Sequence, residues 1–227
     1  MVNVKLNLKE DDFRSVESYK TLRTNIEFAG DENRVLAFTS CTPNEGKTSV
    51  SIMVAKSLTD LGKKVLFIDA DLRKSVLVGR HRVGQKVKGL SHLLSGQSKF
   101  EDTACHTEYE GLDVIFAGPV PPNPAELVSG EKFRDLLKYG QENYDYVIVD
   151  TPPAANVIDA AIIGKICDAM IFVIAANTIS YKFAAKITGQ LAQSGCKILG
   201  VALNKVDFKN NKNYGKYYGK YYGKYEE

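Results

Sequence analysis

A glycine, a lysine and two hydroxyl residues stand together in a segment whose pattern predicts phosphate binding. An apolar stretch, residues 35–38, runs into T-S-C-T-P-N-E-G-K-T-S, residues 39–49, and then into a helix pattern. In such a strand–loop–helix unit, backbone N–H groups at the helix N-terminus bind phosphate, a lysine reaches the β/γ oxygens and a hydroxyl binds Mg²⁺. Lys47 and Thr48 are predicted to fill these two roles. The predicted nucleotide-binding residues are Thr42, Pro43, Asn44, Glu45, Gly46, Lys47, Thr48 and Ser49.

Three aspartates follow apolar strands elsewhere in the chain. Asp69 and Asp71 come after V-L-F-I, and Asp150 comes after Y-V-I-V. In an open α/β sheet the carboxyl ends of the strands form the ligand crevice, so these carboxylates are expected to meet there. An acid at a strand end is, by itself, more often a helix cap or a solvated turn. The strict phosphate-loop pattern has glycine where this chain has Cys41. Three aspartates after apolar strands, together with such a loop, favour Mg-nucleotide chemistry.

Short apolar runs alternate with helix-like stretches, which predicts an α/β fold of the P-loop NTPase type, a mostly parallel sheet flanked by helices on both faces. Predicted strands are Val35–Thr39, Val65–Ile68, Asp113–Phe116, Tyr146–Val149, Ala169–Ala175 and Ile198–Leu203. Predicted helices are Phe13–Phe28, Lys47–Leu61, Gly130–Glu142, Ile158–Ile166 and Tyr181–Gln193. Within the less regular stretch 72–106, G-L-S-H-L-L-S-G predicts a short helix ended by Gly96. Pro119–Pro124 predicts a stiff loop.

The chain is expected to form one domain, residues 1–207, followed by a separate tail. Residues 1–33 precede the first predicted strand and are expected to carry one amphipathic helix. Residues 208–227 hold five lysines and two glutamates, which accounts for the whole net charge of +3. This tail repeats Y-G-K-Y and is predicted to be mobile, because lysine and glycine interrupt every apolar pair. Its six tyrosines are Tyr214, Tyr217, Tyr218, Tyr221, Tyr222 and Tyr225.

The tail has two interpretations. It could be a disordered aromatic segment prone to association. It could instead be a substrate tract, with many acceptor hydroxyls tethered at high effective concentration. The nucleotide motif in the same chain favours the second interpretation.

Composition excludes several other classes. With 44% hydrophobic and 25% charged residues, the chain is typical of globular proteins. Its longest apolar run, residues 169–176, is far shorter than the ~20 residues that span a bilayer, and its first residues are too polar for a secretory signal. The four cysteines and three histidines have no metal-site or disulfide-framework spacing. Without its tail the chain is neutral, so no nucleic-acid partner is expected, and the predicted compartment is the cytoplasm.

Three segments together resemble one family. S-C-T-P-N-E-G-K-T at 40–48, I-D-A-D-L-R-K at 68–74 and V-I-V-D-T-P-P at 147–153 look like the Walker A, Walker A′ and Walker B motifs of the bacterial tyrosine kinases, or BY-kinases. G-L-S-H-L-L-S-G, P-P-N-P-A-E-L, G-V-A-L-N-K-V-D and the tyrosine-rich C-terminus are also similar, and that family's Walker A motif lacks the first glycine. The resemblance implies an ATP- and Mg²⁺-dependent tyrosine autokinase of capsular or exopolysaccharide export.

The resemblance also implies a role for each site residue. Lys47 would contact the β- and γ-phosphates, and Asp69 would be the base or orienter for the attacking tyrosine hydroxyl. Thr48, Asp71 and Asp150 would hold Mg²⁺, partly through water. The six tail tyrosines would be the phosphate acceptors, reached in trans between subunits.

Assembly and partners follow from the same resemblance. In the family, an E-x-x-R-x-x-R motif on the N-terminal helix contacts the neighbouring subunit of a ring, and here Glu17, Lys20 and Arg23 occupy its positions. Lysine lacks the planar fork of the middle arginine, and the alternative is a solvated helix face with local ion pairs. A transmembrane polysaccharide co-polymerase adaptor would supply an activating cytoplasmic tail and recruit the kinase to the membrane. A cognate tyrosine phosphatase and other protein substrates are further implied partners.

Two other functions compete with the kinase. A partition or septum-positioning ATPase shares the deviant phosphate loop, but such proteins usually carry an extra lysine where this chain has Thr42. A guanine-nucleotide switch is suggested by Asn204-Lys205-Val206-Asp207, which matches N-K-x-D. That match is short, and a similar string follows the last strand in the kinase family.

Overall fold

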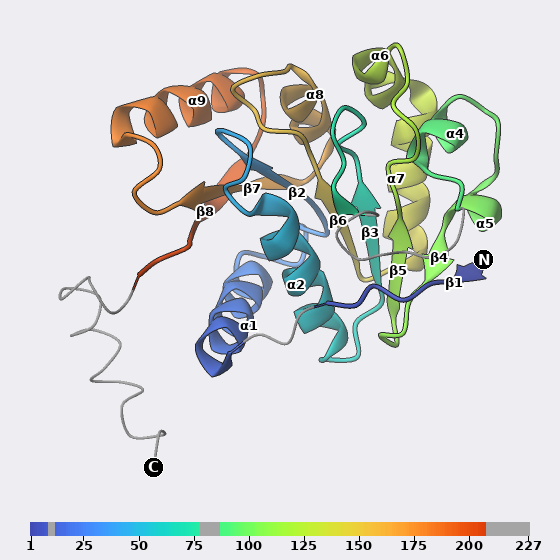
Figure 1. The fold of residues 1–227 in the computed structure, drawn as a ribbon, viewed down its shortest axis with the longest axis horizontal. Helices are drawn as coiled ribbons and strands as arrows, with labels where there is room; N and C mark the ends of the chain where they lie inside the picture. Colours follow the sequence, from blue (N-terminus) through green and yellow to red (C-terminus); the bar gives the residue numbers. More distant parts are fainter. Residues whose placement is uncertain (9–11, 78–86, 208–227) are drawn as a thin grey trace.

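The computed structural model describes residues 1–8, 12–77 and 87–207, and these contain an eight-stranded sheet (Figure 1). The strand order is β1-β4-β5-β3-β6-β2-β7-β8, and every neighbouring pair is parallel except β4 and β5. The strands are β1 (Val2–Asn3), β2 (Val35–Ser40), β3 (Val65–Asp69), β4 (Cys105–His106), β5 (Leu112–Ile115), β6 (Tyr146–Asp150), β7 (Ala169–Ala175) and β8 (Ile198–Asn204).

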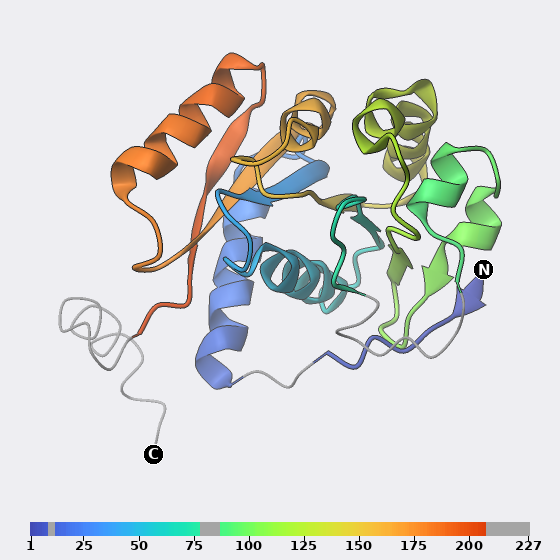
Figure 2. The same ribbon diagram turned by 45° about the horizontal axis from the view of Figure 1, so that its top comes forward.

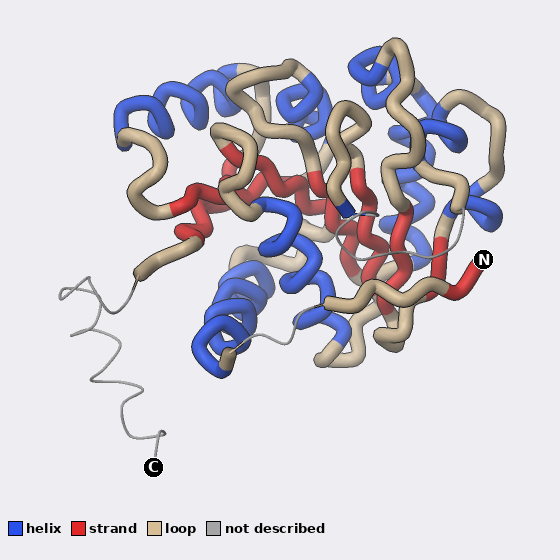
Figure 3. The backbone as a smooth tube through the Cα atoms, viewed as in Figure 1, coloured by secondary structure: helices blue, strands red, loops and turns tan. Residues whose placement is uncertain are grey.

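Helices cover both faces of the sheet. They are α1 (Phe13–Phe28), α2 (Lys47–Thr59), α4 (Leu90–Leu94), α5 (Phe100–Thr103), α6 (Pro124–Ser129), α7 (Glu131–Asn143), α8 (Asp159–Ile166) and α9 (Tyr181–Gln193). Figure 2 shows α1 and α2 on one side and α6 to α9 on the other. The strands form the middle layer, drawn in red between the blue helices in Figure 3. The α/β class and the mostly parallel, doubly covered sheet predicted from the sequence are confirmed.

Alternate strand residues build two separate cores, because successive side chains of a strand point to opposite faces. In β2, Val35 and Ala37 pack toward α7, α8 and α9, whereas Leu36 and Phe38 pack toward α1 and α2. All four of these side chains are fully or almost fully buried. Burial on both faces explains why this strand reads as a continuous apolar run without alternation.

The structure corrects two expectations and confirms a third. Residues 1–33 hold a strand as well as a helix, because β1 pairs with β4 at one edge of the sheet. Neither of these two-residue strands has an apolar run that could have predicted it. The stiff loop predicted over Pro119–Pro124 ends in a helix, since Pro124 is the first residue of α6, a position where its fixed φ suits the helix. The short helix before Gly96 is confirmed as α4, and Gly96 has a φ of +81°.

The carboxyl ends of β2, β3 and β6 meet at one edge of the sheet. Asp69 and Asp150 are register partners on β3 and β6, and Phe38 of β2 pairs with Asp150 from the other side. Parallel pairing therefore places the ends of three strands, and the loops that follow them, side by side. In the described ranges, no helix combines the length and the apolar character that crossing a membrane requires.

Candidate active site

The phosphate loop joins β2 to α2, and its conformation requires glycine at one position. Gly46 is the N-cap of α2 with a φ of +94°, and Asn44 has a φ of +67°. A Cβ on Gly46 would lie 2.1 Å from Nδ2 of Asn204, so a larger residue would meet both strain and a clash. The first N–H groups of a helix have no intrahelical acceptor, which makes this end of α2 an anion-binding site.

The eight predicted nucleotide-binding residues all lie in this loop and the first turn of α2. Buried Glu45 closes the loop on itself, because its Oε2 accepts a hydrogen bond from the backbone N–H of Thr42 at 2.7 Å. Its other oxygen, Oε1, is buried without a hydrogen-bond partner among the described residues. Of the eight, Lys47, Thr48 and Glu45 are buried, Thr42, Gly46 and Ser49 are half-buried, and Pro43 and Asn44 are exposed.

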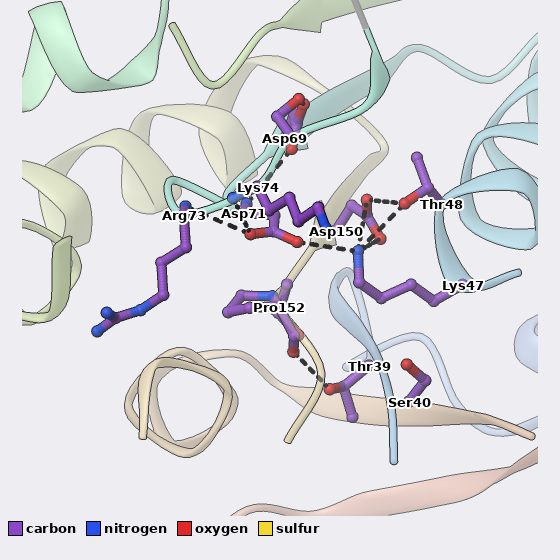
Figure 4. Close-up of polar contacts among 12 residues, drawn as sticks. Thr39, Ser40, Lys47, Thr48, Asp69, Asp71, Arg73, Lys74, Asp150 and Pro152 are labelled. Atoms are coloured by element: carbon purple, nitrogen blue, oxygen red, sulfur yellow. Dashed lines mark hydrogen bonds and ion pairs between the residues drawn. The ribbon is translucent and has the colours of Figure 1, made fainter. Parts of the chain in front are cut away.

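Lys47, Thr48, Asp71 and Asp150 form one polar cluster at the loop (Figure 4). Nζ of Lys47 lies 3.2 Å from each carboxylate oxygen of Asp150 and 3.7 Å from Oδ2 of Asp71. Oγ1 of Thr48 donates a hydrogen bond to Oδ2 of Asp150 at 2.6 Å. The structure thus brings the predicted phosphate lysine together with the hydroxyl and the two carboxylates predicted to hold the metal.

Burial and neighbouring charges set the electrostatics of this cluster. Burial alone would lower the pKa of Lys47, but the carboxylates of Asp150, Asp71 and Asp69 outweigh it and raise that pKa. Burial raises the pKa of Asp150 above its ordinary value, although Lys47 and Thr48 act in the opposite direction. One ammonium therefore faces three carboxylates, and an added cation would be stabilised here.

Asp69 is 1% exposed at the end of β3. Its Oδ2 accepts a hydrogen bond from Oγ of Ser75, and its Oδ1 accepts one from the backbone N–H of Asp71 at 3.3 Å. Burial, followed by the charge of Asp150, raises the pKa of Asp69 from 3.8 to about 7. A carboxyl group that titrates near neutral pH is well suited to accept a proton from a hydroxyl.

The donor set fits magnesium. A threonine hydroxyl and two carboxylates are hard oxygen ligands, and Mg²⁺ is usually bound by one or two carboxylates together with substrate phosphates. Across the described part of the chain, no three His, Cys, Asp or Glu side chains form a metal centre by themselves. The cluster of Thr48, Asp71 and Asp150 thus resembles a site that a metal shares with a phosphate ligand.

Two contacts of the site have no signal in the sequence. Arg73, in the turn after β3, makes a bidentate pair with the carboxylate of Asp159 at the start of α8. Oγ1 of Thr39 donates to the carbonyl of Pro152 at 3.0 Å, which joins the end of β2 to the loop after β6 (Figure 4). Each pair joins residues more than 80 positions apart, so only the fold reveals them.

The three predicted interface residues lie on α1 but have different surroundings. Glu17 and Lys20 pair with each other at 2.7 Å on the helix surface. Arg23 instead faces α2 of its own chain, where Nη1 donates to the carbonyl of Ser57 at 2.8 Å. The ring contact stays a prediction, and the six tail tyrosines lie outside the described residues.

The fold and the loop define a P-loop nucleotide-binding protein, and a family model described as "AAA domain" matches residues 33–194. Tyrosine-protein kinase CpsD of Streptococcus agalactiae is 41% identical over 208 residues, which are 89% of this chain and 91% of that protein. The kinase domain of Escherichia coli tyrosine kinase ETK has 39% identity and a TM-score of 0.80, covering 84% of this chain and 75% of that chain. The chimerical protein CapA2B2 has 30% identity and a TM-score of 0.80, covering 91% and 94%. The chain belongs to the bacterial tyrosine kinase family.

The competing ATPase shares the fold at lower similarity. The septum site-determining protein MinD of Pyrococcus horikoshii, solved with Mg-ADP, is 25% identical with a TM-score of 0.64. The resemblance to tyrosine kinases predicted from the sequence is therefore confirmed over the septum-positioning alternative. The N-K-x-D string of the second alternative, the guanine-nucleotide switch, lies at the end of β8, where Asn204 and Lys205 contact the phosphate loop.

Proposed function

We propose that this tyrosine-protein kinase uses ATP and Mg²⁺ to phosphorylate its own six tail tyrosines, in trans between subunits, and thereby regulates capsular or exopolysaccharide synthesis and export. The observation that carries the proposal is the buried cluster of Lys47, Thr48 and Asp150 at the phosphate loop, with Asp69 beside it. The similarity to tyrosine-protein kinases indicates that tyrosine hydroxyls are the phosphate acceptors, and the tail contains six tyrosines.

Each residue of the site has a defined task in this proposal. The N–H groups of the loop and the charge of Lys47 bind the β- and γ-phosphates, displacing the contact between Lys47 and Asp150. Thr48, Asp71 and Asp150 would hold Mg²⁺, which supplies charge neutralisation when bound. Asp69 accepts the proton of the attacking tyrosine hydroxyl, whose ordinary pKa near 10 leaves it protonated. Positioning and charge neutralisation are the main requirements of phosphoryl transfer.

The partners belong to the same proposal. A membrane adaptor with an activating cytoplasmic tail would recruit the chain to the inner face of the membrane. The likeness to a chimeric protein, CapA2B2, along nearly the whole of both chains is consistent with a kinase that works with a second component. A ring of identical subunits, contacting through α1, would bring each tail to a neighbouring site.

A mixing experiment tests transfer in trans. The donor carries phenylalanine at all six tail tyrosines and keeps its site, while the acceptor is Asp69→Asn with an intact tail. With Mg-ATP and an adaptor tail, we expect mass spectrometry to find phosphotyrosine in the acceptor's C-terminal peptide.

The control is the same mixture with an Asp150→Asn donor, which should leave the acceptor unphosphorylated. A donor that modifies no tail tyrosine, while the wild type does, would show that transfer occurs within one chain. Absence of phosphotyrosine in the wild type under all of these conditions would refute the autokinase itself.

A further inference from the structure

Two side chains at the end of β8 hold the phosphate loop from outside. Nδ2 of Asn204 donates to the carbonyl of Glu45 at 3.0 Å, and Nζ of Lys205 donates to the carbonyl of Asn44 at 2.6 Å. The two accepting carbonyls are consecutive in the loop. Asn204 and Lys205 thus form hydrogen bonds to two adjacent peptide groups of the loop, about 160 positions away in the sequence.

Fixing these carbonyls also fixes two N–H groups. In a trans peptide the C=O and N–H bonds point in opposite directions. The carbonyl of Asn44 shares a peptide plane with the N–H of Glu45, and the carbonyl of Glu45 shares one with the N–H of Gly46. Carbonyls directed toward β8 therefore direct both N–H groups away from β8, as in the backbone concavities that bind anions.

The backbone of the loop agrees with this arrangement. Asn44 and Gly46 both have positive φ, at +67° and +94°, and Asn204 lies so close to Gly46 that a Cβ there would clash. None of the turn, loop and cap hydrogen bonds between described backbone groups uses the N–H of Glu45, Gly46, Lys47 or Thr48. These four donors form a continuous set that can converge on a phosphate.

Lys205 itself has a φ of +55°, which is uncommon for a residue with a side chain. Its strained backbone turns the chain where β8 ends and brings its ammonium group to the loop. In this conformation Nζ of Lys205 donates a charge-assisted hydrogen bond to the carbonyl of Asn44.

We infer that Asn204 and Lys205 are positioning residues that hold the phosphate loop in its anion-binding conformation before the nucleotide arrives. They act through the peptide groups of Asn44 and Glu45 and do not themselves contact the transferred phosphate. The inference rests on the proposed nucleotide chemistry of the loop, but concerns its preorganisation. A preorganised loop binds more tightly because less ordering accompanies binding.

The test compares Asn204→Ala and Lys205→Met with the wild-type full-length chain. Calorimetry with ADP and Mg²⁺ should show an affinity about tenfold lower for Asn204→Ala, the scale of one lost hydrogen bond in a preorganised loop. The smaller loss expected for exposed Lys205→Met should be recovered by Lys205→Arg. In phosphorylation assays the KM for ATP should rise while kcat changes little, since the loop binds ground state and transition state alike.

Lys197→Met is the matched control. Lys197 lies just before the start of β8, at the end opposite Lys205, and its Nζ donates a hydrogen bond to Oδ1 of Asn33 at 2.9 Å and not to the phosphate loop. It removes the same charge and should leave ADP affinity unchanged. Melting temperatures without nucleotide separate this effect from general unfolding. Equal ADP affinity in wild type, Asn204→Ala and Lys205→Met would overturn the inference, as would an equal loss in Lys197→Met. Failure of the wild type to bind ADP would instead contradict the proposed function.

Discussion

Lys47 and Asp150 form a buried ion pair in which one ammonium nitrogen lies 3.2 Å from both carboxylate oxygens. The lysine has 10% and the aspartate 1% of its side chain exposed. Lys47 therefore contributes both to stability and to the proposed function. Its ammonium group compensates the buried carboxylate of Asp150 and is also the group proposed to bind phosphate.

Replacing Lys47 by methionine should therefore abolish kinase activity and also destabilise the protein. Removing one partner of a buried pair costs about 3–5 kcal/mol. The double variant Lys47→Met/Asp150→Asn should recover much of this loss in urea unfolding while remaining inactive. Activity in either variant would contradict the role of Lys47, and equal stability of the two would contradict the pairing.

Asp69→Asn and Asp71→Asn should both stop phosphoryl transfer, by different routes. Asp71 approaches Lys47 at 3.7 Å, whereas Asp69 is hydrogen-bonded by Ser75 and the backbone of Asp71. Calorimetry should show that Asp69→Asn largely keeps its affinity for Mg-ATP, while Asp71→Asn loses more of it. Equal losses of Mg-ATP affinity in the two variants would contradict the assignment of Asp69 to the tyrosine acceptor and of Asp71 to the metal.

The raised pKa of Asp69 predicts a pH dependence of stability without nucleotide. On unfolding, the pKa of this carboxyl group returns from about 7 to its ordinary value of 3.8. Between these two values the folded state binds more protons than the unfolded state, so the contribution of this group to stability falls as pH rises from 3.8 to about 7. Asp69→Asn should lack this fall in urea unfolding at pH 5, 6, 7 and 8.

Asp60→Asn is the control for that series, because Asp60 is a more exposed aspartate paired with Lys56 on the surface. Its pH profile should follow that of the wild type. A profile of Asp69→Asn that runs parallel to the wild type would show that Asp69 does not titrate in this range.

Gly46→Ala should cost stability and lower nucleotide affinity tenfold or more, and Gly62→Ala separates the two causes. Both glycines have positive φ, at +94° and +75°, but a Cβ on Gly62 would meet no atom within 4 Å. Left-handed strain alone costs about 1–2 kcal/mol, so Gly62→Ala should lose that much stability and bind ADP normally. If the two variants behave alike in unfolding and in ADP titration, the contact with Asn204 is unimportant.

The long central strands and their helices were predictable because they are buried on both faces. Strands such as β2 and β6 read as unbroken apolar runs, so their type and place follow from composition. The two-residue strands β1 and β4 were not predictable, because neither has an apolar run, and β1 pairs with residues of β4 about 100 positions away. A strand of that length exists only where the tertiary structure supplies its partner.

The site shows the same division. Lys47, Thr48 and the three aspartates stand at strand ends that the sequence marks, so their convergence could be expected. The contacts of Ser75 with Asp69 and of Arg73 with Asp159 depend on how turns close in space. For Asn204 and Lys205 the sequence suggested the N-K-x-D string of a guanine-nucleotide switch, whereas in the structure their side chains donate hydrogen bonds to carbonyls of the phosphate loop.

The chain carries four buried free thiols, and they are spread over four regions: Cys41 in the phosphate loop, Cys105 in β4, Cys167 after α8 and Cys196 before β8. Burial raises the pKa of the Cys41 thiol to about 11, with Glu45 adding to the effect, so little reactive thiolate exists in the closed state. A buried thiol is alkylated only when its surroundings open. Alkylation rates measured separately for each cysteine of the unmutated protein would therefore show how often each region opens. The rate at Cys41 would also show how far a bound nucleotide reduces the opening of the phosphate loop.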